Sequence, residues 1–447
     1  MSKEISLNKI SDLTKKLSND KHVKILRNAM IRTDSNELSM NWDEYRKIDH
    51  SFSNVISGEM PATNQKSSGR CWGFAGLNLF RVYLGRKHNL KNFEFSQSYF
   101  MFWDKLEKAN YFLESIIDTI SEKSDSRIVM HLLSYPLEDG GQWDMWVNLI
   151  NKYGVLPQTE MSESFSTSQS AQMNKMISNK LREYASELRN FHKNGESLEK
   201  LRELKDKMIE EVFKMLSMHI GTPPQTFDWQ VRNKDKKFLR FENLTPQSFF
   251  KEHVALNLED YVCLINCPMK DKEYNKVYTV EHLGNVIEGR NIRYLNVTSK
   301  EMKDASIKSI KDDNPVWFGC DVGKYFHRNL GVMDTNLFDY NFFYDSEFKM
   351  NKAQRLEYGQ SMMTHAMLFT GVDLDEKGNP VKWRVENSWG KKGGSKGYHI
   401  MSDDWFDEYN YEVVVHKDCL SNELNDLFQN AEAIPLKPWD PMGALAK

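Results

Sequence analysis

Apolar residues recur at helical spacing directly after the first cysteine of the chain. Leu77, Phe80 and Leu84 lie three and four residues apart, which is the spacing of an amphipathic helix. The Ser-Ser-Gly run at residues 67–69 precedes them at positions typical of N-cap residues. The pattern therefore predicts that Cys71 lies at or near the N-terminus of a helix.

Residues 162–219 form a second helical region, rich in Lys, Glu, Met and Leu and poor in Gly and Pro. Its apolar residues keep helical spacing, and we expect its charged residues to form a solvated face. This region predicts a helical insertion. The segments 8–17 and 20–30 predict two further helices.

Strand-like runs follow Pro223-Pro224. They are short, rich in Val, Ile, Tyr, Phe and Trp, and separated by turn residues. They lie at residues 261–265, 277–280, 316–321, 366–372 and 383–387. The last thirteen residues, 435–447, hold three of the twelve prolines and predict an extended, non-helical arm.

Composition narrows the class of protein. The 447 residues carry 60 Lys and Arg against 63 Asp and Glu, a net charge of −3, and 40% of the residues are hydrophobic. A collagen-like, low-complexity or disordered chain is excluded. No excess of positive charge favours nucleic acid or an anionic membrane, and no stretch approaches the ~20 apolar residues of a membrane span.

Five cysteines are too few and too scattered for a disulfide framework, and their number is odd. Cys263 and Cys267 have apolar neighbours and no His or Cys cluster near them, so we expect buried thiols and not a zinc site. The N-terminal residues contain no apolar stretch typical of a secretory signal. These features favour a reducing, cytoplasmic setting.

A thiol at a helix N-terminus is a candidate nucleophile, because unpaired backbone N–H groups stabilise its thiolate. His365 opens an apolar strand-like run and could act as its base, and Asn387 on a second strand could fix the histidine tautomer. Trp389 could shield their hydrogen bond from water. Cys71, His365 and Asn387 therefore suggest acyl transfer.

Two further features suit the same chemistry. The Gln65 amide and the Cys71 backbone N–H could together hold a developing oxyanion. Gly140 and Gly141 supply backbone without Cβ, against which an extended substrate could pair.

Each piece alone has an ordinary structural explanation: a buried cysteine, a structural histidine, a turn at Asn-Ser-Trp-Gly. Their joint occurrence in this order is highly specific. At Gln65, Gly69-Arg-Cys71-Trp-Gly-Phe-Ala, His365-Ala and Asn387-Ser-Trp-Gly the sequence resembles the papain-like cysteine peptidases. The resemblance implies Cys71 as nucleophile, His365 as general base and acid, and no metal or cofactor.

The sequence departs from the secreted enzymes of that family. Ser68 replaces the first cysteine of the family motif, and the histidine follows the nucleophile by 365 − 71 = 294 residues, about twice the usual spacing. The Ser-Gly-Arg-Cys-Trp motif, Asp139-Gly-Gly-Gln-Trp-Asp and the Met-Gly-Ala-Leu-Ala-Lys tail resemble the bleomycin hydrolase and bacterial aminopeptidase C branch.

The resemblance implies an α+β, papain-like fold of two lobes, one helical and one β-barrel-like, with a large helical insertion and an extended C-terminal arm. We expect four parts. Residues 1–160 carry the nucleophile, 161–222 form the insertion, 223–430 form the β-rich lobe with His365 and Asn387, and 431–447 form the arm.

The branch implies an intracellular cysteine aminopeptidase that acts through a thioester, as a homohexamer without membrane association. Its C-terminal arm lies in the cleft, so that Ala446 and Lys447 join Gly140, Gly141 and Trp389 as expected substrate-binding residues. Seventeen residue steps from Asn430 to Lys447 could span about 56 Å at roughly 3.3 Å each.

Three alternatives remain open from the sequence. The protein could be an ordinary papain-like endopeptidase, which N-blocked peptides would distinguish. It could be a Cys-dependent acyltransferase of the transglutaminase type, although that class usually prefers Asp as orienter. It could be a nucleic-acid-binding protein, against which the balanced charge argues.

Overall fold

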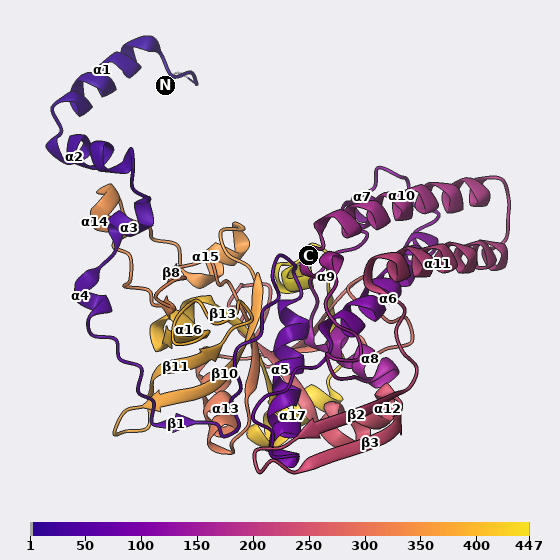
Figure 1. Ribbon diagram of the computed structural model, residues 1–447. Coiled ribbons are helices and arrows are strands. Elements are labelled where there is room, and N and C mark those ends of the chain that lie inside the picture. The colour runs from indigo at the N-terminus through magenta and orange to yellow at the C-terminus, as the bar shows by residue number, and fades with distance from the viewer. Residues whose placement is uncertain (1–2, 447) are drawn as a thin grey trace. The chain divides into compact units, whose positions relative to one another are not determined.

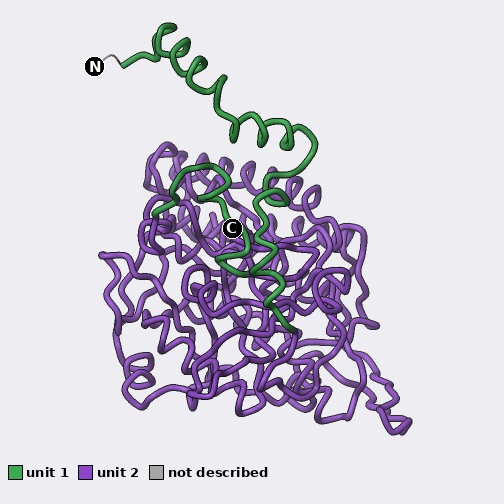
Figure 2. Tube along the Cα trace, turned by 90° about the vertical axis from the view of Figure 1, so that its left-hand side faces the viewer, with its two compact units in different colours: residues 1–49, 334–349 green, residues 50–333, 350–447 purple. Residues whose placement is uncertain are grey.

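The computed structural model describes residues 3–446 (Figure 1). They form two compact units, one from residues 3–49 and 334–349 and one from residues 50–333 and 350–446 (Figure 2). The predicted helices at 8–17 and 20–30 are confirmed in the smaller unit. Its helices are α1 (Leu7–Ser18), α2 (Lys21–Met30), α3 (Ser35–Ser39), α4 (Trp42–Tyr45) and α14 (Tyr340–Tyr344).

Within the described residues, the larger unit contains a twelve-stranded sheet, and all five predicted strand-like runs belong to it. Short β1 (Asn54–Val55) pairs with β10 outside the main path. The order is β14 (Ile434–Leu436), β5 (Lys276–Val280), β6 (Tyr294–Asn296), β4 (Tyr261–Ile265), β13 (Asn410–His416), β7 (Val316–Cys320), β10 (His365–Leu374), β11 (Pro380–Glu386), β12 (Tyr398–Ser402), β9 (Val332–Met333) and β8 (Phe326–His327). A separate hairpin joins β2 (Phe227–Arg232) and β3 (Phe238–Leu244).

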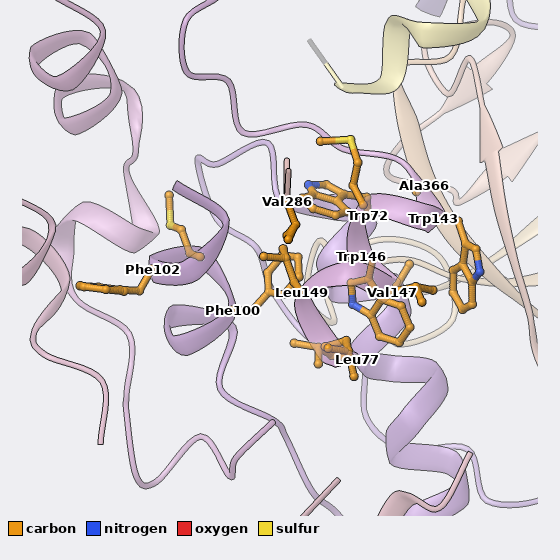
Figure 3. Close-up of a cluster of buried hydrophobic side chains, with 14 of the residues drawn as sticks. Trp72, Leu77, Phe100, Phe102, Trp143, Trp146, Val147, Leu149, Val286 and Ala366 are labelled. Carbon is orange, nitrogen blue, oxygen red and sulfur yellow. The ribbon is translucent and has the colours of Figure 1, made fainter. Parts of the chain in front are cut away.

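Helix α5 (Cys71–Lys87) runs between the sheet and the helical side of the larger unit. It contacts β7 and β10 on one side and α6 (Gln97–Asp118) and α8 (Trp143–Tyr153) on the other. The expectation of an amphipathic helix with one apolar face is wrong, because neighbours bury α5 on nearly every side. Aromatic side chains from all three helices fill this region (Figure 3); they include Trp72, Phe100, Trp143 and Trp146.

The helices predicted for residues 162–219 are confirmed: they are a long antiparallel pair with a short helix before it (Figure 1). These are α9 (Phe165–Ser168), α10 (Ala171–Lys193) and α11 (Leu198–Ile220). The pair packs on α6 through the apolar residues whose three- and four-residue spacing predicted the helices. On α10 these are Met173, Ile177, Leu181, Tyr184 and Leu188, all buried.

The remaining helices of the larger unit are shorter than α10 and α11, and several of them contact the sheet. They are α7 (Arg127–Ser134), α12 (Pro246–Phe249), a π-helical turn (Phe250–Val254), α13 (Ser299–Lys311), α15 (Lys352–Glu357), α16 (Asp403–Tyr409) and α17 (Asn422–Asn430), with 3₁₀ turns at Leu258–Asp260 and Lys417–Cys419. Of the helices within residues 3–446, none combines the length and apolar character that crossing a bilayer requires.

The C-terminal arm begins as β14, which pairs in parallel with β5. The expectation of a wholly non-helical arm is wrong, because Pro441–Ala446 form a 3₁₀ helix. Proline at the start of a helix has a suitable φ and lacks an N–H that would otherwise be unpaired, and the Asp440 carboxylate accepts from the Met442 N–H. Met442 and Leu445 are buried.

Candidate active site

Cys71 is the first residue of α5, as the sequence predicts, and its side chain is buried. The N-cap is Arg70, so the expectation of a cap within residues 67–69 is wrong. The Arg70 side chain makes no capping hydrogen bond. Backbone groups of Ala366 and Trp72 hydrogen-bond the sulfur, which places it beside the start of β10.

His365 is the first residue of β10, and Asn387 follows the last residue of the neighbouring strand β11. Because the two strands are antiparallel, these residues meet at one end of the sheet. His365 Nε2 lies 2.9 Å from Asn387 Oδ1. If the amide oxygen accepts there, Nε2 carries the proton and Nδ1 has a free lone pair.

Trp389 packs against the His365 ring. Its ring centroid lies 4.8 Å from that of His365. The Arg328 guanidinium lies 4.0 Å from the Trp389 centroid, so a cation, an indole and an imidazole follow one another at the cleft wall.

Burial controls the charge of the two reactive groups. It raises the pKa of the Cys71 thiol to about 11, although the backbone hydrogen bond from Ala366 acts in the opposite direction. It lowers the pKa of His365 to about 4, against the effect of the hydrogen bond with Asn387. Both groups are therefore neutral at pH 7 in the unliganded site, and His365 is available as a base.

Gln65 lies in the loop before α5 and is held by hydrogen bonds to Ser68 and Ser388. Its Nε2 donates to the Ser68 carbonyl at 2.6 Å, and its Oε1 accepts from the Ser388 hydroxyl at 2.6 Å. Its backbone N–H donates to the Ser388 carbonyl at 2.8 Å. Since an amide nitrogen carries two protons, one proton of Nε2 remains for a ligand.

A cleft of about 950 Å³ opens at Gln65, His365 and Trp389, and its walls come from the loop before α5, the helices after residue 161 and the β10 end of the sheet. Gly140 lines it. Gly141 packs against Trp72, where a Cβ would lie 2.5 Å from the ring. The lining also includes Gly69, Asp139, Ser170, Asn174, Gly323 and Arg328.

The C-terminal arm lies close to the glycine pair. The Met442 carbonyl accepts from Gln142 Nε2 and from the Tyr294 hydroxyl, each at 3.3 Å, and Gln142 directly follows Gly141. Ala446 is half-buried and packs against the adjoining core. Lys447, the other arm residue expected to bind substrate, lies outside the described residues.

Three charged residues that line the cleft had no role expected from the sequence: Asp139, Asp321 and Arg328. Asp139 directly precedes Gly140, so its place in the Asp-Gly-Gly motif was a usable signal. Asp321 follows β7, whose last residue, Cys320, lies opposite His365 in the sheet register. Nothing in the sequence around Arg328 indicates its position over Trp389.

Comparison with known proteins shows similarity to one family of peptidases over nearly the whole chain. A family model described as the Peptidase C1-like family matches residues 4–443. An aminopeptidase C of Listeria innocua serovar 6a is 45% identical over 447 residues, which cover 100% of both chains. Human bleomycin hydrolase is 43% identical over 447 residues, with 98% of each chain covered.

The fold also matches a solved structure. The crystal structure of PepW from Lactobacillus rhamnosis HN001 superposes with a TM-score of 0.97 at 43% sequence identity, covering 99% of both chains.

Proposed function

This chain belongs to the peptidase C1-like family, and we propose that it is a cysteine aminopeptidase that releases N-terminal residues from peptides through a thioester acyl-enzyme. The observation that carries the proposal is the hydrogen bond between His365 Nε2 and Asn387 Oδ1 at 2.9 Å, made where β10 meets the Cys71 sulfur. It orients a neutral imidazole beside a thiol at a helix N-terminus.

Cys71, His365 and Gln65 have separate roles in the proposed reaction. His365 takes the thiol proton as the Cys71 sulfur bonds to the carbonyl carbon of the first peptide bond. Gln65 Nε2–H and the Cys71 backbone N–H hold the resulting oxyanion. The C–N bond breaks as His365 gives the proton to the leaving amine, and a water deprotonated by His365 then attacks the thioester and releases the thiolate.

We assign substrate binding to Gly140 and Gly141, to Trp389 and to the end of the arm. Gly140 and Trp389 line the cleft. The arm approaches the glycine pair through Met442. An arm end placed there would block one side of the cleft, so that a substrate enters with its free N-terminus, and Ala446 or Lys447 would receive its ammonium group.

The nucleophile is tested by replacing Cys71 with Ala in the full-length protein. Turnover of a free dipeptide amide should be abolished while the circular dichroism spectrum and the unfolding midpoint are kept. Cys419→Ala is the matched control, because that thiol is only partly buried and lies outside the lining of the cleft. Normal turnover by the Cys71→Ala protein would refute the mechanism.

The arm is tested by removing residues 444–447, which leaves the Met442 carbonyl contacts in place. N-acetylated peptides should be resistant in the intact protein and cleaved by the truncated one. Lys437→Ala, which removes only an exposed ion pair with Glu281, is the control. Cleavage of N-acetylated peptides by the intact protein would favour the endopeptidase alternative.

We propose that the protein works as a cytoplasmic homohexamer. The resemblance to the bleomycin hydrolase branch supports this assembly, and α1 exposes apolar side chains that an assembly could cover: Leu7, Ile10, Leu13 and Leu17. Five free thiols suit a reducing compartment. Light scattering after size-exclusion chromatography tests the assembly, since a mass of one chain in dilute buffer would contradict it.

A further inference from the structure

Asp139 is a buried carboxylate whose hydrogen-bonding capacity is used by the protein itself. Its Oδ2 accepts from the Gly69 N–H at 2.8 Å and from the Ser170 hydroxyl. Its Oδ1 accepts from Asn174 Nδ2 at 2.7 Å, and Lys105 Nζ lies 2.6 Å from the same oxygen. A carboxylate offers about four acceptor sites, so Asp139 has none left for a substrate although it lines the cleft.

One peptide group connects Asp139 to the Gln65 amide. The N–H of the Ser68–Gly69 peptide donates to Asp139 Oδ2, and its C=O accepts from Gln65 Nε2 at 2.6 Å. Because a peptide group is planar and rigid, holding its N–H also holds its carbonyl. The orientation of this peptide therefore determines where the second proton of Gln65 Nε2 points.

Gly69 makes the close approach to Asp139 possible. A Cβ on Gly69 would lie 2.8 Å from the Asp139 Cβ, closer than two carbon atoms can pack. The Gly69 carbonyl in turn lies 4.0 Å from the Cys71 sulfur. The residue that Asp139 holds thus lies directly beside the nucleophile.

We propose that Asp139 is a positioning residue for oxyanion stabilisation, which holds the Ser68–Gly69 peptide so that Gln65 Nε2–H points at the substrate carbonyl oxygen. The inference rests on the proposed peptidase chemistry and adds a residue to it. Ser170 and Asn174 belong to the start of the helical insertion, so the insertion supports the oxyanion site as well as forming a wall of the cleft.

An ionised aspartate is the side chain that these four donors require. Although burial acts to raise the pKa of Asp139, the charge and hydrogen bond of Lys105 and the hydrogen bonds of Ser170 and Asn174 hold that pKa well below its usual range. In either orientation, an asparagine would turn its NH₂ group toward two donors. Asp139→Asn therefore breaks the network with almost no change of volume.

The experiment compares two reagents on the full-length protein. The Cys71 sulfur adds to the carbonyl carbon of a peptide aldehyde as His365 takes the thiol proton, and the tetrahedral adduct has an oxygen that needs the oxyanion donors. Iodoacetamide alkylates the same sulfur with loss of iodide and forms no oxyanion. In Asp139→Asn we expect aldehyde affinity and kcat to fall about 10- to 100-fold, below the ~10²–10³ that loss of an oxyanion donor costs, with the alkylation rate unchanged.

Lys105→Met combined with Asp139→Asn separates positioning from stability, because the single variant leaves the fully buried Lys105 ammonium without its counter-ion. The double variant should regain unfolding resistance while aldehyde affinity stays low. Gly69→Ala should lower aldehyde affinity in the same way. In a Gln65→Ala background, Asp139→Asn should lower kcat further by less than about two-fold, because the two residues act as one unit.

Unchanged aldehyde affinity in Asp139→Asn, or a parallel loss of aldehyde affinity and alkylation rate, would overturn the inference. So would full additivity with Gln65→Ala. These outcomes are distinct from failure of the proposed function, which would show as a wild-type protein that binds the aldehyde but releases no N-terminal residue from peptides.

Discussion

The Arg81 guanidinium on α5 and the Glu386 carboxylate at the end of β11 form an ion pair in which each side chain is only 1% exposed. Arg81 also donates to the Pro61 carbonyl at 2.9 Å. The pair joins the helix that begins at Cys71 to the strand that ends directly before Asn387. It therefore holds together the two elements that carry the nucleophile and the orienting amide.

Arg81→Met should destabilise the protein strongly. Removing one partner of a buried ion pair leaves the other charge unpaired and costs about 3–5 kcal/mol. The midpoint of urea unfolding should fall, and Arg81→Met combined with Glu386→Met should recover most of the loss. An unchanged midpoint in the single variant would show that the pair does not hold α5 to the sheet.

The pH dependence of kcat/KM should reflect the buried histidine. Burial lowers the pKa of His365 from 6.5 to about 4, and the positive charge of Arg328 acts in the same direction. Because catalysis needs the neutral imidazole, activity should be lost only as the pH falls well below 6.5. Arg328→Gln should move this acid limb to higher pH; a wild-type limb centred at 6.5 or above would contradict the expectation.

Gly141→Ala should disturb the buried packing next to Gly140, which lines the cleft. The new methyl group would lie 2.5 Å from the buried Trp72 ring, and overpacking of this kind typically costs about 1–3 kcal/mol. Thermal unfolding and peptide turnover measure the effect. Gly323→Ala is the matched control, because its Cβ would meet nothing closer than Asp321 Oδ1 at 3.8 Å and should leave the unfolding temperature unchanged.

Asp440→Asn should loosen the C-terminal arm. Lys272 Nζ lies 2.9 Å from Asp440 Oδ2, with the two side chains 1% and 11% exposed, and this pair anchors the arm before its 3₁₀ helix. Without the charge on Asp440, the buried ammonium of Lys272 favours release of the arm.

The ratio of N-acetylated to free peptide turnover should therefore rise at least about ten-fold in Asp440→Asn, since 1.4 kcal/mol of lost anchoring suffices for that factor. Lys437→Ala serves again as the control. A ratio that rises on truncation at residue 443 but not in Asp440→Asn would show that other contacts hold the arm.

Local motifs made much of the site predictable from the sequence. The pairing of Cys71 with a helix start, and of His365 and Asn387 with strand ends, follows from patterns of a few residues each. The long helices of the insertion were predictable for the same reason, because their buried positions repeat every three or four residues.

Features that depend on distant segments were not predictable. The Arg81–Glu386 pair joins residues 305 positions apart, and the four donors around Asp139 come from separate parts of the chain. Burial of α5 on nearly every side depends on what packs around it, which its own periodicity does not reveal. The 3₁₀ helix of the arm likewise depends on the Asp440 hydrogen bond and on the burial of Met442.

Arg70, the residue before the nucleophile, forms two parallel hydrogen bonds with Glu163, at 2.9 and 2.8 Å. Glu163 lies at the start of the insertion, and the Ser67 N–H donates to the Ser168 carbonyl in the same stretch. The insertion is therefore not an interchangeable module. A chimera that took residues 161–222 from a relative would have to bring matching partners for Arg70 and Ser67, or it would misplace the nucleophile along with the specificity it was meant to transfer.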